Sequence, residues 1–491
     1  MTTITPSHSS TFPVKQQFEP PDPREARRRL HHEADIVIVG AGVSGCAAAV
    51  AFGNQGRSVI LLEKSLDEPE RVVGELLQPG GVGALRELGM EDCLEGIDAV
   101  PCHGYWVSYY REPVNIPYPK PIDGPRPEGR SFHHGRFIQN LRQAVRRSPN
   151  VMLVEAKVTE MVRQESTGTV LGVMTETTEK KKDCYFGSLT LICDGVFSGF
   201  RKDFLPYKPS SRSKFFALEL LDAELPRPQY GHVLLSNAPP ILIYQIGPRT
   251  TRIFMDVPED LPSASPAVGG VKSHMLKVVL PELPPGCRPS FEHAVAHGKL
   301  RSMPNSFLPP SVPKTPGVLI LGDAMNMRHP LTGGGMTIAF QDVLLLSQML
   351  SPENVPSLQD QAAVQAQLAR FHWDRKRSSS LINILAMALY ALFAAASDGD
   401  PALAALKNGC FRYFQRGGRC VDEPCGMLAG IIHSPAVLLY HFFSVAFYAI
   451  WLRLCEAPIW LKPWALVVEG VMVLWRASMV IGPYLVWEVR W

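Results

Sequence analysis

The sequence lacks paired cysteines, a large net charge and an apolar N-terminus. Its ten cysteines include no C-x-x-C pair, and Cys420 and Cys425 have neither partner histidines nor a second cysteine pair at zinc-binding spacing. We therefore expect reduced, mostly buried thiols and no metal site. The formal net charge of +3 implies no polyanionic partner and argues against nucleic-acid binding.

Residues 1–33 are polar, contain PREARRRLHH, and lack the apolar stretch of a secretory signal or an anchor helix. We therefore expect the chain to start in the cytosol. A length of 491 residues favours two or three structural units with a buried core.

A β-α-β pattern follows this polar segment. Residues 34–64 read ADIVIVGAGVSGCAAAVAFGNQGRSVILLEK, which predicts a strand over Ala34–Val39, a glycine turn, a helix of small residues, and a second strand over Ser58–Leu62. The turn carries G-x-G-x-x-G, and an acid closes the second strand. Glycines and acid in this context predict a dinucleotide site.

Each residue of this fingerprint has a physical reason. Gly40 permits the tight turn, Gly42 lets the backbone approach a pyrophosphate, and Gly45 lets the helix pack on the strand. Glu63 can bind a ribose hydroxyl, which favours FAD or NAD over NADP. A glycine turn in an ordinary parallel sheet is the alternative, but it would not explain the acid.

A second motif, GDAMNMRHPLTGGGM, follows the apolar run GVLIL. The pattern predicts a buried strand that ends at the carboxylate of Asp323, followed by glycines that open a helix from Gly334 through Leu346. FAD has a polyol, a diphosphate and a ring that can become anionic, and so fits both features. Asp323 would bind a ribityl hydroxyl, and the helix N-terminus would stabilise negative charge on the reduced ring.

A third motif, CDGVFSGFR, would alone indicate a turn at the end of a strand. In the order GxGxxG, DG, GD, the three motifs resemble those of flavoprotein monooxygenases related to the aromatic hydroxylases. RVVGELLQPGGVGAL, GRSFHHGRF and GDAMNMRHPLTGGGMTIAFQD narrow the resemblance to the squalene monooxygenase (squalene epoxidase) family, fungal type, from Ala34 to the C-terminus.

The predicted fold class is α/β, with a Rossmann-type, glutathione-reductase-like FAD-binding domain, an inserted β-rich substrate domain and a C-terminal helical membrane-associated region. Four β-rich runs between Ser211 and Asp256 predict a largely antiparallel sheet. Connectors are expected at Pro258–Pro266, Pro281–Pro285 and Pro304–Pro316. The predicted divisions are a polar segment 1–33, FAD-binding parts 34–155 and 316–376, connecting strands 156–186, a return to the FAD domain 187–205, the substrate domain 206–315, and the helical region 377–491.

The resemblance implies where FAD is held. Glu63 would hold the adenosine ribose, and Arg71 and Arg136 would lie along the cofactor. Asp323 would contact the ribityl and diphosphate region. The full set expected to bind FAD is Gly40, Gly42, Val43, Ser44, Gly45, Glu63, Lys64, Arg71, Glu75, Arg136, Val158, Asp194, Asp323, Gly335 and Met336.

Two further residues are implied to act beside the flavin ring. Tyr105 and Gln78 match the family's hydrogen-bonded pair at the ring and the substrate cavity. We assign them to positioning and local polarity, without making either a proton donor. Without the resemblance, Tyr105 would be an aromatic on a strand face, and Glu75 could equally be a helix N-terminal acid.

The implied chemistry is epoxidation of an alkene. Because an isolated alkene is a weak nucleophile, the reduced flavin must activate oxygen while the protein holds one terminal double bond in a dry pocket. The resemblance implies conversion of squalene to (3S)-2,3-oxidosqualene in sterol (ergosterol) synthesis. Two alternatives stay open: a related epoxidase of secondary metabolism acting on another terpenoid prenyl chain, and a non-catalytic FAD protein that senses lipid or scaffolds partners.

Only one strand-linked G-x-G-x-x-G occurs in the chain. Electrons from NADPH must therefore arrive either by direct docking or through a separate protein. The resemblance implies the second route, with a membrane-bound NADPH-cytochrome reductase as the partner.

The chain becomes apolar after Arg377. LINILAMALYALFAAA predicts a buried or interfacial helix, whereas Met427 to Leu452 carry no formal charge over a length sufficient to cross a bilayer. WALVVEGVMVLW and SMVIGPYLVW are each short or broken by a charge or proline. Six of the eight tryptophans lie between Trp451 and Trp491, as in an interfacial belt.

We predict from this tail a monotopic helical hairpin in one leaflet, in preference to a full span or a soluble helical bundle. The predicted location is the cytosolic face of the endoplasmic reticulum membrane, and also lipid droplets. A thirty-carbon hydrocarbon could then enter from the bilayer without crossing water.

Overall fold

The structure of the chain, a computed structural model, describes residues 23–177, 179–394, 400–458 and 462–490. A first sheet has the strand order β8-β2-β1-β11-β10-β9, with β17 paired to β11. Its strands are β1 Glu33–Val39, β2 Val59–Glu63, β8 Val151–Glu155, β9 Lys157–Arg163, β10 Val170–Glu176, β11 Lys182–Ile192 and β17 Val318–Ile320. The β8-β2-β1-β11-β17 pairings are parallel, and β10 is antiparallel to both of its neighbours.

The parallel strands are buried apolar runs, because helices cover one face of the sheet and side chains of β9 and β10 pack against the other. Helices α2 (Val43–Asn54) and α9 (Gly335–Met349) contact each other, and Phe52 and Phe340 are fully buried in the core that these helices share with the sheet. The strands predicted over Ala34–Val39 and Ser58–Leu62 and the helix predicted from Gly334 through Leu346 are confirmed, with ends that shift by at most three residues.

A second sheet has the order β16-β12-β15-β14-β13-β5-β6 and is antiparallel except between β13 and β5. Its strands are β5 Gly104–Tyr109, β6 Glu112–Pro117, β12 Ser210–Leu221, β13 Gly231–Leu235, β14 Ile241–Gln245, β15 Thr250–Pro258 and β16 Arg301–Phe307. The largely antiparallel sheet predicted between Ser211 and Asp256 is therefore confirmed.

Two details of the second sheet differ from the sequence prediction. Strands β5 and β6 come from the part of the chain that the sequence assigned to FAD binding, yet they pair with β13. Pro304 was expected in a connector but lies in β16, opposite Lys214 of β12. A proline is tolerated there because β16 is an edge strand, where one N–H can be missing from the ladder.

A small third sheet joins β3, β7 and β4. Its strands are β3 Leu76–Leu77, β4 Val100–Cys102 and β7 Gly129–Ser131. The remaining helices are α1 Pro23–Leu30, α3 Pro79–Glu87, α4 His134–Arg147, α5 Arg201–Phe204, α6 Gly270–His274, α7 Leu280–Glu282, α8 Arg288–His297, α10 Gln361–Phe393, α11 Pro401–Gln415, α12 Arg419–Leu428, α13 Pro435–Glu456, α14 Lys462–Trp464 and α15 Gly470–Val489. Seven of the ten cysteines are buried, as expected.

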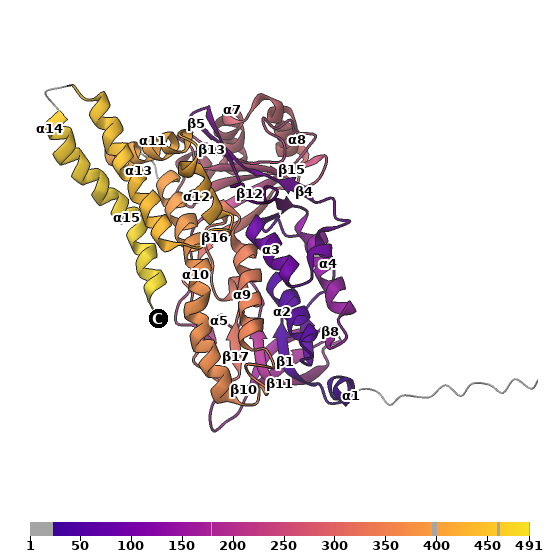
Figure 1. Cartoon of the computed structure of the whole chain (residues 1–491). Coiled ribbons are helices and arrows are strands. Elements are labelled where there is room, and N and C mark those ends of the chain that lie inside the picture. The colour runs from indigo at the N-terminus through magenta and orange to yellow at the C-terminus, as the bar shows by residue number, and fades with distance from the viewer. Residues whose placement is uncertain (1–22, 178, 395–399, 459–461, 491) are drawn as a thin grey trace, which may run out of the picture.

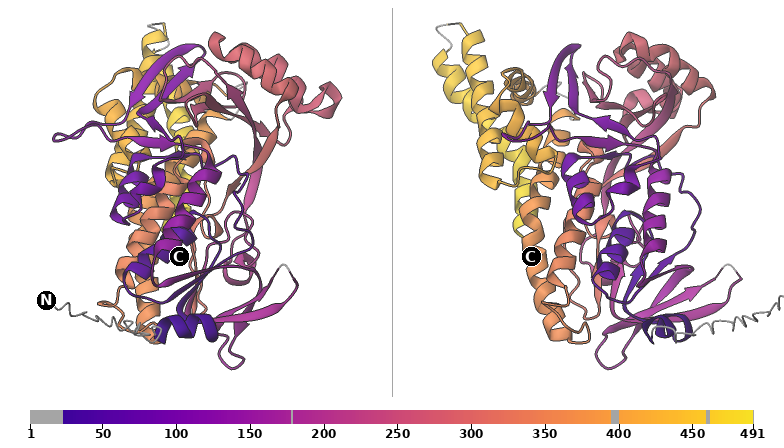
Figure 2. Two further views of the ribbon diagram at one scale, coloured as in Figure 1. Left: turned by 90° about the vertical axis from the view of Figure 1, so that its right-hand side faces the viewer. Right: turned by 45° about the vertical axis from the view of Figure 1, so that its right-hand side comes forward.

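Figure 1 shows the first sheet at the bottom of the molecule, the second sheet at the top, and α10 running along one side. Helices α13 and α15 lie beyond α10, and Figure 2 shows them projecting at the end that carries the second sheet. Within the predicted run LINILAMALYALFAAA, Leu381, Ile384 and Leu392 are buried in α10, which confirms a buried helix; residues 395–396 lie outside the described residues.

Two segments of the tail are long and apolar enough to cross a membrane by length and composition, Pro435–Glu456 and Val467–Val489. The prediction that SMVIGPYLVW is short and broken by its proline was wrong, since α15 continues through Pro483. Ile481 and Leu485, on either side of that proline, pack in one cluster with Leu381 of α10, and this packing offsets the lost backbone hydrogen bond. Trp460, Trp491 and the side chain of Trp464 lie outside the described part of the predicted belt.

The N-terminal segment contains a helix that its polar composition did not predict. Residues 1–22 lie outside the described residues, but α1 docks against the segments that precede β2 and β8. Arg28 is buried and donates to Ser58 Oγ at 3.1 Å and to the Pro149 carbonyl at 3.4 Å, while Arg24 donates to the Gly56 carbonyl at 2.6 Å. These contacts tie the segment to the nucleotide-binding unit.

Candidate functional site

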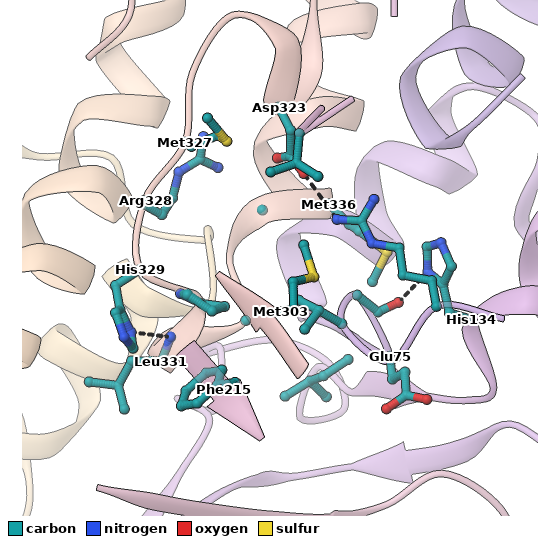
Figure 3. A pocket seen from close by; sticks show the side chains of 18 of the residues that line it. Glu75, His134, Phe215, Met303, Asp323, Met327, Arg328, His329, Leu331 and Met336 are labelled. Atoms are coloured by element: carbon teal, nitrogen blue, oxygen red, sulfur yellow. Dashed lines mark hydrogen bonds and ion pairs between the residues drawn. The ribbon is translucent and has the colours of Figure 1, made fainter. Parts of the chain in front are cut away.

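A cavity open to solvent lies between the first sheet and one face of the second. Figure 3 shows its walls, with Asp323 and His134 towards one end and Phe215 towards the other. The end near Asp323 is formed by the β1–α2 turn and charged side chains, whereas Phe215, Leu242 and Phe254 make the other end apolar. The cavity thus offers a polar region and an apolar region side by side.

The three fingerprint glycines occupy the positions that their predicted roles require. Gly40 has φ +100°, and a Cβ on it would lie 2.6 Å from the Cys193 carbonyl oxygen. A Cβ on Gly45 would lie 1.9 Å from the Gly40 oxygen, so only glycine lets α2 approach the turn. A Cβ on Gly42 would meet no atom within 4 Å, which leaves open space where a ligand could approach the backbone.

Glu63 braces this turn from the end of β2. Its Oε2 accepts from the Ala41 N–H at 2.7 Å, and its Oε1 accepts from the Ser65 N–H at 3.3 Å. Buried Arg142 lies 3.7 Å from the same carboxylate and donates to the Ala41 carbonyl at 3.1 Å. The carboxylate therefore fixes the turn while its remaining acceptor sites stay available to a hydroxyl.

The second and third motifs meet at the cavity. Asp323 follows β17 and pairs with Arg71 at 3.2 Å. Arg201, the last residue of CDGVFSGFR, donates to the Asp323 carbonyl at 3.0 Å and to the Ala324 carbonyl at 2.7 Å. Asp194 accepts from the Gly199 N–H at 3.0 Å through Oδ2, whereas its buried Oδ1 has no partner among the described residues.

Tyr105 and Gln78 converge on one backbone oxygen. Tyr105 donates to the Thr332 carbonyl at 3.3 Å, and Gln78 donates to the same oxygen at 2.8 Å. Tyr118, which the sequence reasoning missed, donates to Gln78 Oε1 at 2.6 Å and fixes the amide orientation. Burial raises the pKa of Tyr105 well above its ordinary value, so its hydroxyl stays protonated.

Glu75 lines the cavity, but its carboxylate is engaged by the second sheet. Arg252 of β15 donates to both carboxylate oxygens at 2.9 Å, and both side chains are buried. This bidentate pair ties the segment before β3 to the sheet that forms the apolar wall.

Several predicted residues do not line the cavity. Lys64 is exposed, and Arg136 forms a surface ion pair with Asp98 at 2.6 Å. Val158 is a half-buried residue of β9 that packs against the core. Their contact with a cofactor stays a prediction. Gly42, Val43, Ser44, Arg71, Glu75, Tyr105, Asp323, Gly335 and Met336 do line it.

Sequence reasoning also missed a polar cluster behind the apolar wall. Buried Asp256 accepts from Asn305 Nδ2 at 2.9 Å and from the Tyr390 hydroxyl at 3.0 Å. His329 stacks on Tyr390 with ring centroids 3.7 Å apart and lines the cavity. The available signal in the sequence is His329, which lies in the RHP triplet before the glycine run.

Comparisons with known proteins identify the family to which the chain belongs. Residues 186–467, more than half of the chain, match the family model described as squalene epoxidase. Squalene epoxidase erg1 of Aspergillus fumigatus is 58% identical over 468 residues, which cover 95% of this chain and 96% of that protein. The chain belongs to the squalene epoxidase family. Within that family, squalene epoxidase ERG1 of Saccharomyces cerevisiae is 40% identical over 93% of this chain and 96% of its own length.

The fold of this squalene epoxidase family member resembles those of solved flavoproteins. Flavin-dependent brominase Bmp2 has a TM-score of 0.66 at 14% identity, covering 86% of this chain and 99% of that one. PqsL of Pseudomonas aeruginosa has a TM-score of 0.62 at 19% identity, covering 74% and 98%. Residues 35–67 match a model described as an FAD-binding domain. The resemblance, the α/β fold class and FAD as cofactor are thereby confirmed.

The residues present fit FAD. The open space at Gly42 suits a diphosphate at the N-terminus of α2, where N–H groups face an anion. Two buried polar atoms without partners among the described residues, Arg71 Nε and Arg328 Nη1, belong to side chains that line the cavity and mark donors that a polar ligand would satisfy.

We expect stability to fall as the pH drops below about 6.5, because buried histidines resist protonation. Burial lowers the pKa of His134 to about 4, and its Nδ1–H donates to the Gly74 carbonyl at 2.8 Å; burial also lowers the pKa of His232 to about 4. Between pH 6.5 and 4 the unfolded chain binds more protons than the folded one, so stability is lost as pH falls. The two histidines together should cost about 2 kcal/mol between pH 6.5 and 5.5.

Urea unfolding of the wild type and of His134→Gln at both pH values would measure this. The loss of stability between the two pH values should be smaller in the variant by about 1 kcal/mol, the share of His134. An identical pH dependence in the two proteins would contradict the assignment.

Proposed function

We propose that the chain is an FAD-dependent monooxygenase that epoxidises a terminal double bond of squalene to (3S)-2,3-oxidosqualene in sterol (ergosterol) biosynthesis. It would use O2 and electrons delivered from NADPH by a separate reductase. The observation that carries the proposal is a nucleotide-binding turn and an apolar wall that share one cavity, in a chain 58% identical to a protein named squalene epoxidase. The family match names squalene, and no observation favours another prenyl chain.

The chain's own residues would hold FAD along the polar end of the cavity. Backbone N–H groups of Gly42–Ser44 would face the diphosphate, Glu63 would accept from the adenosine ribose, and Asp323 would accept from a ribityl hydroxyl. When bound and reduced, the flavin supplies the activation of O2 that an isolated alkene requires.

The apolar wall would orient the hydrocarbon and exclude water. Phe215, Leu242 and Phe254 face the cavity and are buried, so an alkene beside them is desolvated. Tyr105 and Gln78 hold the Thr332 carbonyl in the segment before α9. Their proposed role is to position this segment at the cavity, with no proton transfer assigned to either.

The proposed electron donor is an NADPH-cytochrome reductase. The sequence carries one strand-linked G-x-G-x-x-G, which forms the β1–α2 turn. A single dinucleotide fold assigned to FAD leaves NADPH oxidation to another protein.

We propose that α13 and α15 embed the enzyme in one leaflet of the endoplasmic reticulum membrane, facing the cytosol, and also on lipid droplets. Both helices present large exposed apolar side chains, including Trp451, Trp475 and Met479. Trp475 and Met479 lie four residues apart and therefore share one face of α15. An apolar face with tryptophans suits the interface of a bilayer.

Carbonate extraction of microsomes tests this membrane proposal. The wild type should stay in the pellet, and the double variant Trp475→Glu, Met479→Glu should move largely to the supernatant, because two charges on the lipid-facing side oppose insertion. Phe197→Glu, at a side chain 77% exposed in the nucleotide-binding part, is the matched control and should stay in the pellet. A wild type that is released would reject embedding, and labelling of exposed Cys455 by an impermeant maleimide from the lumen would indicate a full span.

The catalytic proposal is tested with the purified, flavin-loaded chain, reductase, NADPH and squalene. Mass spectrometry should find one product heavier than squalene by one oxygen atom, and the gene should restore growth of a sterol-deficient fungus. Absence of the epoxide despite full flavin loading would contradict the proposal. Turnover of a different prenyl terpenoid without squalene turnover would instead identify a paralogous enzyme.

A further inference from the structure

Arg328 is a buried cation with unused hydrogen-bond donors on the cavity wall. Its side chain is 8% exposed and lines the cavity. Nη2 donates to the backbone oxygen of Asn326 at 2.7 Å and to its Oδ1 at 3.0 Å. Nε and Nη1 have no partner in the described part of the chain. A buried donor without a partner raises the free energy of the folded protein, so a ligand atom that accepts from Nε or Nη1 would remove this cost.

The neighbouring carboxylates are already engaged. Asp323 pairs with Arg71 at 3.2 Å, and Asp342 pairs with Arg375 at 2.7 Å. Glu488 is the third acid whose charge acts on Arg328, and its carboxylate accepts from Asn383 Nδ2 at 2.8 Å. Across the described ranges, no carboxylate forms an ion pair with Arg328 itself. Its positive charge therefore lacks a dedicated partner within the protein.

The unused side of Arg328 lies next to the N-terminus of α9. Nη1 is 3.9 Å from where a Cβ on Gly335 would lie, and Gly335 is the first residue of that fifteen-residue helix. Figure 3 shows Arg328 beside Met327, on the wall of the cavity away from His134. A helix N-terminus and a guanidinium thus converge on one region, and both favour negative charge.

Asn326 holds the guanidinium in this orientation. Its Oδ1 also accepts from Asn383 Nδ2 at 3.1 Å, and its own Nδ2 donates to the Leu308 carbonyl at 2.8 Å. Asn326 is 1% exposed, so Arg328 is anchored by a side chain that is itself fixed. Such preorganisation lets a cation stabilise developing charge without rearrangement.

We propose that Arg328 is a redox-tuning residue whose guanidinium, together with the N-terminus of α9, binds the pyrimidine edge of the isoalloxazine ring and stabilises the reduced, anionic flavin. The inference rests on the proposed binding of FAD. The diphosphate is assigned to the other helix N-terminus, at Gly42, which leaves the ring as the anionic group near α9. Reduction adds two electrons and one proton to the ring, and no bond to Arg328 forms or breaks.

The midpoint potential of the bound flavin tests this role. Holoprotein of the wild type, Arg328→Met and Arg328→Lys would be reduced in equilibrium with a reference dye. Methionine fills similar space without charge, so the preference for reduced over oxidised flavin should fall at least tenfold, which lowers the potential by about 30 mV for a two-electron couple. Lysine should retain part of the effect. Arg249→Met, at an exposed pair with Asp222, is the matched control and should leave the potential unchanged.

A second measurement needs only the wild type and covers the case in which Arg328→Met does not fold. The absorbance of the reduced holoprotein should show the anionic form down to a pH at which free reduced flavin is already protonated. A neutral reduced flavin in the wild type, or a wild-type potential in Arg328→Met, would overturn the inference. If the wild type binds flavin and forms epoxide but Arg328→Met has the wild-type flavin potential, only this inference is rejected. If the wild type binds no flavin, the proposed function is rejected.

Discussion

Gly45→Ala is expected to yield a protein without bound flavin. The new Cβ would lie 1.9 Å from the Gly40 oxygen and 3.4 Å from Cys193 Cβ, so α2 would have to move off the turn. The contacting atom is backbone, which cannot rotate away as a side chain can. We therefore expect both a lower unfolding temperature and complete loss of the flavin absorbance band.

Gly42→Ala should fail differently, although it lies in the same turn. Its Cβ would meet no protein atom within 4 Å, so the apoprotein should unfold at the wild-type temperature. The added methyl group would occupy the space where the diphosphate approaches the backbone, and FAD affinity should fall at least tenfold, or about 1.4 kcal/mol.

Flavin-to-protein absorbance ratios and thermal unfolding of the apoproteins would separate the two effects. Gly83→Ala in α3, where a Cβ also meets no atom within 4 Å, is the matched control and should keep both flavin and stability. Full flavin occupancy in Gly45→Ala, or an unchanged affinity in Gly42→Ala, would contradict the assignment of this turn.

Arg252→Met is expected to destabilise the protein by about 3 to 5 kcal/mol. The substitution would leave the Glu75 carboxylate buried without the guanidinium that donates to both of its oxygens. Loss of the pair would also release the segment before β3 from β15, so the cavity wall should loosen.

A double-mutant cycle measures this coupling directly. Glu75→Leu combined with Arg252→Met should be more stable than Arg252→Met alone, because no uncompensated charge remains. Arg249→Met removes an arginine from an exposed ion pair in the turn before β15 and should show no measurable change in urea unfolding. If Arg252→Met lowers the free energy of unfolding by less than about 1 kcal/mol, the result would contradict the assignment of a buried ion pair.

The parts of the site that the sequence predicted are those set by local chemistry. Gly40, Gly42 and Gly45 have roles that depend on backbone geometry within a few residues, and Asp323 lies in the turn directly after β17, where no long-range information is needed to position it. The family resemblance added Tyr105 and Gln78, but it could not show that both donate to the Thr332 carbonyl.

The parts that the sequence did not predict depend on contacts between distant segments. Arg252 lies 177 residues from Glu75, and nothing near either residue indicates that they pair. Tyr118 reaches Gln78 only because β5 and β6 join the second sheet, which hydrophobic alternation does not specify. The helix over Pro23–Leu30 was missed because its stability comes from Arg28 docking beside β2, while its own composition is polar.

The central claim, that a flavin held in this cavity transfers oxygen to a squalene double bond, is tested most directly by a single turnover under ¹⁸O₂. The reduced holoenzyme with bound squalene would be mixed with ¹⁸O₂, and both the product mass and the hydrogen peroxide released would be measured. We predict an epoxide that carries one ¹⁸O atom, in an amount close to the flavin reoxidised. Reoxidation that yields only hydrogen peroxide, with squalene recovered unchanged, would contradict the account.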